Sequence, residues 1–145
     1  MRASAHGISI EAPHGWEVRI FKRPQAMPVM HLATFGLSGH DGDFGAAATA
    51  RMTPGDAFAA LVEYQPDHIV VPGAGLFREI GIPRISAAGF SPAQLQVTRP
   101  GQLGRQLFFT ASGRPFCLYC VVSPEHAGDR GAFERLSAVL RSLAV

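Results

Sequence analysis

The sequence predicts an α+β fold in which an antiparallel sheet is sandwiched between two helices. Short runs of alternating apolar and polar residues, separated by Pro and Gly turns, are typical of antiparallel strands. Two amphipathic helical segments lie far apart in the sequence, with several strands between them. The last expected strand, Phe116–Val122, is apolar on both faces, so both faces need cover. One helix on each face of the sheet satisfies this requirement. The alternative is a curved sheet that is covered on one side only.

Four strands are expected in the first third of the chain, at Ile8–Ala12, Trp16–Phe21, Met30–Leu37 and Ala46–Arg51. The clearest signal lies between the first two, where the Pro13-His14-Gly15 turn leads to the single tryptophan, Trp16. A Pro and Gly turn between two alternating runs indicates a β-hairpin.

The first helix is expected at Pro54–Tyr64. Thr53 is a candidate N-cap, Pro54 suits the first helical position, and Asp56 suits the first turn. The apolar residues that then share one side of a helix are Ala57, Phe58, Leu61 and Val62. The small residues Ala46–Ala48 of the expected fourth strand would let a helix approach the sheet closely.

The second half of the chain begins with an irregular segment, Gln65–Gly81, around a possible short strand at His68–Val71. Irregular connections of this length are uncommon in compact domains and are often functional. Further strands are expected at Ile82–Ser86, Gln94–Arg99, Arg105–Ala111 and Phe116–Val122. A helix from about Arg130 to Leu143 closes the chain, because apolar residues recur there every three or four positions.

Composition limits the classes of function. A chain of 145 residues is expected to form a single globular domain, residues 1–145. The formal net charge is only +2, and the arginines are scattered rather than aligned, which argues against nucleic acid as a partner. No apolar stretch approaches the ~20 residues that span a bilayer, so membrane insertion is not expected. With two cysteines and no secretory signal in the first dozen residues, a cytoplasmic location is expected.

The P-x-G-W turn of Pro13, Gly15 and Trp16, and the closing helix that follows a long apolar strand, resemble the PsbP/Mog-like superfamily. The middle of the chain, with Gly39–Asp43 and Phe58-x-x-Leu61-x-x-Tyr64, is also similar to single-domain proteins of GC-rich bacteria that carry no assigned function. The resemblance implies an α/β/α sandwich around an antiparallel sheet. Members of the superfamily include a photosystem subunit, a Ran-GTPase-binding protein, lipoproteins and secretion chaperones, so the resemblance implies binding to another macromolecule rather than catalysis.

Cys117-Leu118-Tyr119-Cys120 has the spacing of a C-x-x-C motif. Redox motifs of this kind lie at a helix N-terminus, and zinc sites need further ligands. Residues three apart on a strand point to opposite faces, about 10 Å from each other, which is too far for a disulfide. The pattern therefore favours two core residues over a reactive pair.

No other motif predicts a metal, cofactor or catalytic site. His40-Asp41-Gly42-Asp43 could offer ligands to a cation, but Asp-Gly between strands is typical of a turn. The six histidines show no metal-binding spacing, and Gly73-Ala74-Gly75 lacks the rest of a phosphate loop. The sequence predicts no enzyme and no cofactor.

The remaining hypothesis is a non-catalytic protein-interaction or accessory module. Its partner surface is predicted in Pro66–Glu79, with Phe77, Arg78 and Glu79 as the contact residues. The segment is more apolar than a connecting loop requires, and Arg78 and Glu79 supply rim charges beside its apolar residues Ile69, Val70, Val71, Leu76 and Phe77. The partner is expected to be another protein or a second copy of the chain, in a homodimer. An alternative places Phe77 in the core and Ile69–Val71 in an edge strand. Two other functions stay open: a carrier of small apolar ligands with a pocket between the sheet and the helix at 54–64, and a thiol enzyme that uses Cys117 or Cys120.

Overall fold

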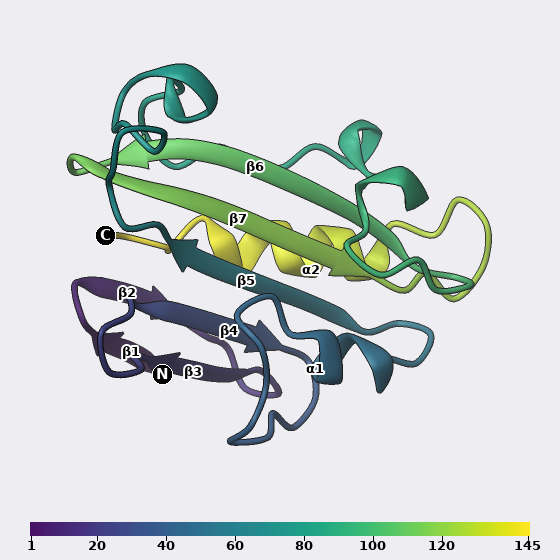
Figure 1. Cartoon of the computed structure of the whole chain (residues 1–145). Coiled ribbons are helices and arrows are strands. Elements are labelled where there is room, and N and C mark those ends of the chain that lie inside the picture. Colours follow the sequence, from purple (N-terminus) through teal and green to yellow (C-terminus); the bar gives the residue numbers. More distant parts are fainter.

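The computed structural model describes all 145 residues and is mostly β, with two antiparallel sheets and two short helices (Figure 1). The smaller sheet pairs β1 (Arg2–Ala5) with β2 (Ile8–Glu11). The larger sheet has five strands in the order β3-β4-β5-β7-β6, and every neighbouring pair is antiparallel. Its strands are β3 (Glu17–Phe21), β4 (Val29–Ala33), β5 (Ala57–Glu63), β6 (Leu103–Ala111) and β7 (Arg114–Val122). The helices are α1 (Ala46–Ala50) and α2 (Gly131–Leu140), and neither is long and apolar enough to cross a membrane.

The predicted α/β/α sandwich between two helices is wrong. The segment predicted as the first helix forms β5, the central strand of the larger sheet, and all seven of its residues are buried. A continuous apolar run is compatible with a strand buried on both faces as well as with a helix. The apparent helix start is a tight turn instead, in which the Asp56 N–H donates to the Thr53 carbonyl (3.0 Å) and Gly55 has a φ of +94°.

The predicted strand at Ala46–Arg51 is also wrong, because this segment contains α1. Three successive alanines favour a helix over a strand. Gly45 precedes the helix with a φ of +70°, and a Cβ at this position would lie 2.2 Å from Cζ of Phe58. Gly45 thus lets the chain turn into α1 directly above the central strand.

The larger sheet is covered on both faces. Helix α2 and the small sheet cover one face, around a core that includes Ile10, Leu32, Leu118 and Leu136. Helix α1 and neighbouring loops cover the other face, over Phe58, Tyr119 and Val121. The expectation that both faces of the last strand need cover is confirmed, since every residue of β7 after Arg114 is buried. On the α1 side, the cover comes from the five-residue helix α1 and from loops rather than from a second long helix.

Of the other predicted helices and strands, all but three form the predicted kind of secondary structure. The strands expected at Ile82–Ser86, Gln94–Arg99 and His68–Val71 are absent, and β1 was not predicted. The segment from Glu79 to Gln94 instead covers the free edge of β6. Three backbone N–H groups of β6 donate hydrogen bonds to this segment. The Gly104 N–H donates to the Ser91 carbonyl (3.0 Å) and the Gln106 N–H to Oε1 of Gln94 (3.0 Å). The Thr110 N–H donates to the Glu79 carbonyl (2.8 Å). Such cover protects an edge strand from pairing with another chain.

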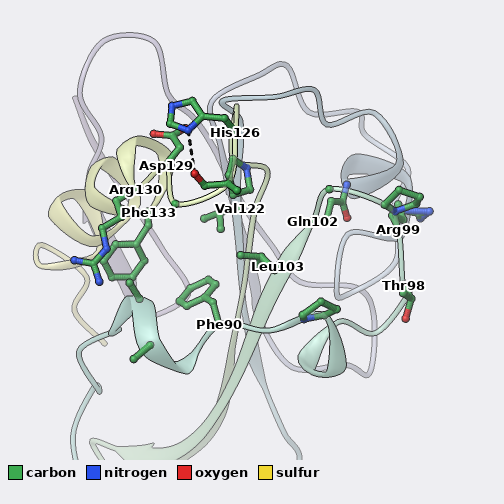
Figure 2. A pocket seen from close by; sticks show the side chains of 18 residues that line it. Phe90, Thr98, Arg99, Gln102, Leu103, Val122, His126, Asp129, Arg130 and Phe133 are labelled. Carbon is green, nitrogen blue, oxygen red and sulfur yellow. Dashed lines mark hydrogen bonds between the residues drawn. The ribbon is translucent and has the colours of Figure 1, made fainter.

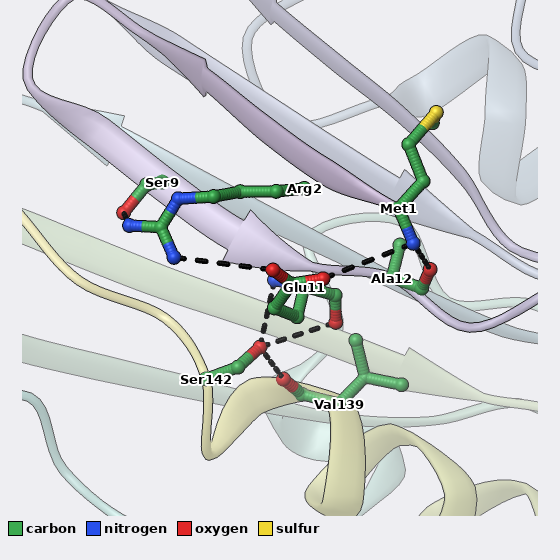
Figure 3. A network of polar contacts seen from close by, with 7 residues as sticks. All are labelled: Met1, Arg2, Ser9, Glu11, Ala12, Val139 and Ser142. Atoms are coloured by element: carbon green, nitrogen blue, oxygen red, sulfur yellow. Dashed lines mark hydrogen bonds and ion pairs between the residues drawn. The ribbon is translucent and has the colours of Figure 1, made fainter.

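The small sheet is attached to the end of α2 through Ser142 (Figure 3). The Ser142 hydroxyl accepts from the Glu11 N–H (2.9 Å) and lies within donating distance of the carbonyls of Glu11 (3.1 Å) and Val139 (2.8 Å). Ser9 and Ala144 exchange two backbone hydrogen bonds of 2.9 Å. The two ends of the chain are therefore packed together.

Candidate functional site

The structure places the three residues of the predicted partner surface in different surroundings. Phe77 is buried, with its ring centroid 5.3 Å from that of Tyr64 and 5.8 Å from that of Phe108. Arg78 and Glu79 are exposed. A partner that docks on this segment would meet the two charged side chains but not the phenylalanine ring.

The two thiols of the C-x-x-C pattern lie on opposite faces of β7 and are both buried. Cys120 belongs to the core under α2, whereas Cys117 alternates with Tyr119 and Val121 on the α1 side. Burial raises the pKa of Cys117 to about 12 and also raises the pKa of Cys120. Thiol catalysis needs the opposite shift, because the thiolate is the nucleophile.

The His40–Asp43 loop uses its carboxylates for structure. Asp41 accepts from the backbone N–H groups of Gly42, Ala47 and Ala48 (2.8, 2.9 and 2.9 Å) and so caps α1. Asp43 forms an ion pair with Arg23. No group of three or more His, Cys, Asp or Glu side chains in the structure is arranged to hold a metal ion.

A pocket of about 770 Å³ lies at the end of the larger sheet where β6 begins and β7 ends (Figure 2). Three chain segments complete it: a 3-10 turn at Ala87–Gly89, the loop before β6, and the loop that enters α2. The carrier pocket predicted between the sheet and a helix at 54–64 has no place in this fold, because that segment is β5.

One wall of this pocket is apolar and continuous with the core. Leu103 and Val122 are direct cross-strand partners on β6 and β7, and both pack in the core under α2. Phe90 and Phe133 meet edge to face, with ring centroids 5.4 Å apart. Two further lining residues, Ala88 and Ala127, are small and exposed.

The polar residues of the pocket lie in two groups. Arg99 and Gln102 lie in the loop before β6, and Gln102 is 6% exposed. The other group is His126, Asp129 and Arg130, at the entry to α2 (Figure 2). Asp129 accepts from the Glu125 and Gly131 N–H groups (both 3.0 Å), and these bonds lower the pKa of its carboxyl.

Sequence reasoning missed this pocket. Its loops carry Pro92, Pro100-Gly101, Pro124 and Gly128, which read individually as ordinary turns. The signal that could have indicated the pocket is that several of these turns flank the paired ends of β6 and β7, so that they gather at one end of the sheet.

Comparison of the chain with protein-family models, curated proteins and solved structures found no match. The resemblance to the PsbP/Mog-like superfamily therefore stays a prediction, and the functional proposals rest on geometry.

Proposed function

We propose that the protein binds a small, largely apolar molecule in the pocket between β6, β7 and α2. The observation that carries this proposal is the apolar wall of Phe90, Leu103, Val122 and Phe133 in a pocket of about 770 Å³. Ligand sites of proteins are mostly apolar concavities of roughly 300–1,000 Å³ with a few polar groups. Both the volume and the lining of this pocket fall within that description.

The pKa shifts of the titratable side chains fit a protein that binds its ligand without converting it chemically. The side chains whose pKa is raised most, Tyr64, Cys117 and Cys120, lie outside the pocket. Asp129 does line it, but its lowered pKa comes from backbone hydrogen bonds at the start of α2. An acid or base tuned for catalysis would have its pKa shifted toward neutrality instead.

The proposal is tested with the fluorescent probe N-phenyl-1-naphthylamine and a pair of tryptophan variants. Ala88→Trp adds a bulky side chain at an exposed residue that lines the pocket. Ala93→Trp makes the same change at an exposed position of the next 3-10 turn, outside the pocket. We expect saturable binding by the wild type and Ala93→Trp, and a loss of about tenfold or more in affinity for Ala88→Trp. Equal affinity in both variants, or no binding by the wild type, would contradict the proposal.

A second candidate function, protein interaction through the segment 65–81, is favoured by its exposed apolar residues. Four of the six exposed large hydrophobic residues of the chain lie there, namely Ile69, Val71, Leu76 and Ile80. Apolar exposure concentrated in this way is typical of contact surfaces. The test compares the wild type with the double variant Ile69→Ser plus Ile80→Ser by sedimentation and by capture of partners from the native host. Val97→Ser is the control, because Val97 is exposed but lies elsewhere in the chain. If sedimentation and captured partners are the same for all three proteins, the segment is not a contact surface.

We also propose a cytoplasmic location. Both cysteines are unpaired and buried on opposite faces of β7, an arrangement suited to a reducing compartment. Fractionation of the native host, with detection by an antibody to the protein, tests this location.

A further inference from the structure

The two edges of the larger sheet differ in what covers them. β6 forms one edge and bonds to the segment from Glu79 to Gln94. β3 forms the other edge (Figure 1), and every hydrogen bond of its backbone goes to β4. The small sheet packs over one face of β3, where Ala3, Val18 and Ile20 contact the core, but it forms no hydrogen bond with the edge. A strand edge without backbone partners readily adds another strand.

The pairing of β4 with its neighbours decides which backbone groups of β3 point outward. In an antiparallel sheet, alternate residues of a strand bond to the neighbour on each side. Just past the end of β4, the Thr34 N–H donates to the Ala57 carbonyl (3.2 Å), so the even-numbered residues of β4 bond to β5. The odd-numbered residues of β4 therefore bond to the odd-numbered residues of β3. The N–H and C=O groups of Val18 and Ile20 consequently point outward and have no partner.

The side chains of β3 carry a charge pattern that is complementary to itself. Glu17 and Arg19 lie two positions apart, so they point to the same face of the sheet. Neither forms an ion pair within the chain, although the Arg19 guanidinium donates to the Ser38 carbonyl. Opposite charges directly across from each other stabilise a pair of strands, whereas like charges there destabilise it. The charges of β3 therefore favour one register of pairing with a second, antiparallel β3.

Within β3, only Val18 and Ile20 can form hydrogen-bonded pairs across this edge, which leaves three symmetric registers. When Val18 pairs with Val18 of the second copy, Glu17 lies opposite Arg19 on both sides of the two-fold axis. When Val18 pairs with Ile20, the two copies of Arg19 face each other and repel. When Ile20 pairs with Ile20, Arg19 lies opposite Phe21 and gains no carboxylate. Side chains of non-hydrogen-bonded pairs lie closest together, so the first register brings Glu17 and Arg19 into contact.

We infer that two copies of the chain pair antiparallel through β3, with Val18 opposite Val18 and Glu17 opposite Arg19. The two five-stranded sheets then continue as one sheet across a two-fold axis. Two central hydrogen bonds join the Val18 N–H of each copy to the Val18 carbonyl of the other. The ligand pocket lies beside β6, at the opposite edge of the sheet, so this inference is independent of the proposed function.

Sedimentation equilibrium measures this pairing directly. At micromolar concentration the wild type should sediment with twice the 15.5 kDa mass of the chain. Val18→Pro removes the outward N–H and both central hydrogen bonds, so this variant should be monomeric. Proline is compatible with an edge strand where the missing N–H would face solvent. Val18→Thr is the matched control, because it keeps the N–H and a branched side chain of similar size, and it should remain dimeric.

Charge reversal tests the register. Glu17→Arg and Arg19→Glu each place like charges opposite each other twice, so each variant alone should dimerise about tenfold or more weakly than the wild type. An equimolar mixture of the two variants should recover the dimer, because each reversed side chain then faces an opposite charge on the other variant. Arg84→Glu is the control, since Arg84 is exposed and lies outside β3, and it should dimerise like the wild type.

Three results would overturn the inference: a monomeric wild type, a Val18→Pro variant that dimerises as tightly as Val18→Thr, or a mixture of folded charge variants that does not recover the dimer. Near-UV circular dichroism checks that each variant is folded. Glu17 is exposed, so Glu17→Arg decides the result if Arg19→Glu is not native. In that case, a Glu17→Arg dimer as tight as that of the wild type would show that the register is wrong.

Discussion

At the scale of single residues, burial decides what the titratable side chains do. His31 lies on β4 beneath the loop that leads to α1, between the rings of Phe21 and Phe58 with centroid distances of 5.2 and 5.3 Å. Its Nε2–H donates to the Asp43 carbonyl, 2.8 Å away. Burial lowers the pKa of His31, aided by Arg19, while Asp41 and Asp43 act in the opposite direction. The folded protein therefore favours the neutral imidazole.

We expect the protein to lose stability as the pH falls below about 6.5, the value for His in an unfolded chain. The unfolded chain then binds a proton that folded His31 resists, so unfolding is favoured by up to about 1.4 kcal/mol per pH unit until the lowered pKa is reached. Urea unfolding measured between about pH 7 and pH 5 should show a flatter profile for His31→Gln than for the wild type.

His14→Gln is the control for this measurement, because His14 is exposed on a turn. The carboxyls of Asp67 and Asp129, whose pKa values are lowered, act only in more acidic solution, below about pH 4. Parallel profiles for the wild type and His31→Gln would show that His31 does not carry the effect.

The two cysteines should be inert in the folded protein. Because burial raises the pKa of Cys117 to about 12 and also raises that of Cys120, both thiols are protonated at neutral pH and shielded from reagents. We expect Ellman's reagent to label neither thiol in the native state and both in urea. Ala93→Cys, an exposed position, supplies the positive control. Rapid native labelling of Cys117 or Cys120 would instead favour the thiol-enzyme hypothesis.

At the scale of elements, the short helix α1 depends on a residue outside it. A helix of five residues is not stable by itself, and its N-cap position is occupied by Gly45, which has no capping side chain. The Asp41 carboxylate replaces that cap from four residues upstream and binds two N–H groups of α1. The sequence predicted that Asp41 lies in a turn, but it did not predict that the Asp41 carboxylate caps α1.

Asp41→Ala should therefore lower the free energy of unfolding by about 1–2 kcal/mol, the usual effect of removing a cap with several acceptors. Asp43→Ala removes an exposed ion pair with Arg23 and should cost less than about 1 kcal/mol. Urea unfolding of the two variants at neutral pH gives the comparison. Equal losses would mean that the backbone contacts of Asp41 contribute little to α1.

At the scale of the whole molecule, the small sheet is joined to the larger sheet by one arginine. Arg114, at the start of β7, donates from Nε (3.2 Å) and Nη2 (2.7 Å) to Oε1 of Glu63 on β5. The same guanidinium reaches the carbonyls of Gly7 (3.0 Å) and His6 (3.2 Å) between β1 and β2. The side chain of Glu63 is only 5% exposed, so its charge depends on this pairing.

Arg114→Met should destabilise the protein by about 3 kcal/mol, because it leaves the Glu63 carboxylate buried without a partner. Adding Glu63→Gln should recover part of that loss, since the unpaired charge is then absent. A double-mutant cycle of unfolding free energies measures the coupling. Additive losses would show that Arg114 acts through the backbone carbonyls of the small sheet rather than through Glu63.

The sequence by itself determined the elements whose pattern is local. Alternation and turn residues correctly predicted β2, β3, β4, β6 and β7, and helical spacing correctly predicted α2. The apolar run in β7 also indicated that both faces of the sheet are covered. These features follow from neighbouring residues alone, because side-chain direction along a strand or helix has a set period.

Only the tertiary structure decided which of the segments Ala46–Ala50 and Ala57–Glu63 forms a helix and which forms a strand. The apolar run of β5 suits a buried strand and a helix alike, and its pairing with β4 and β7 selects the strand. Helix α1 likewise depends on Asp41 and on the close approach of Gly45 to Phe58. The pocket combines residues 87–103 with residues 122–133 because β6 and β7 pair and α2 folds back beside them. Such a site depends on contacts distant in sequence, which no local pattern encodes.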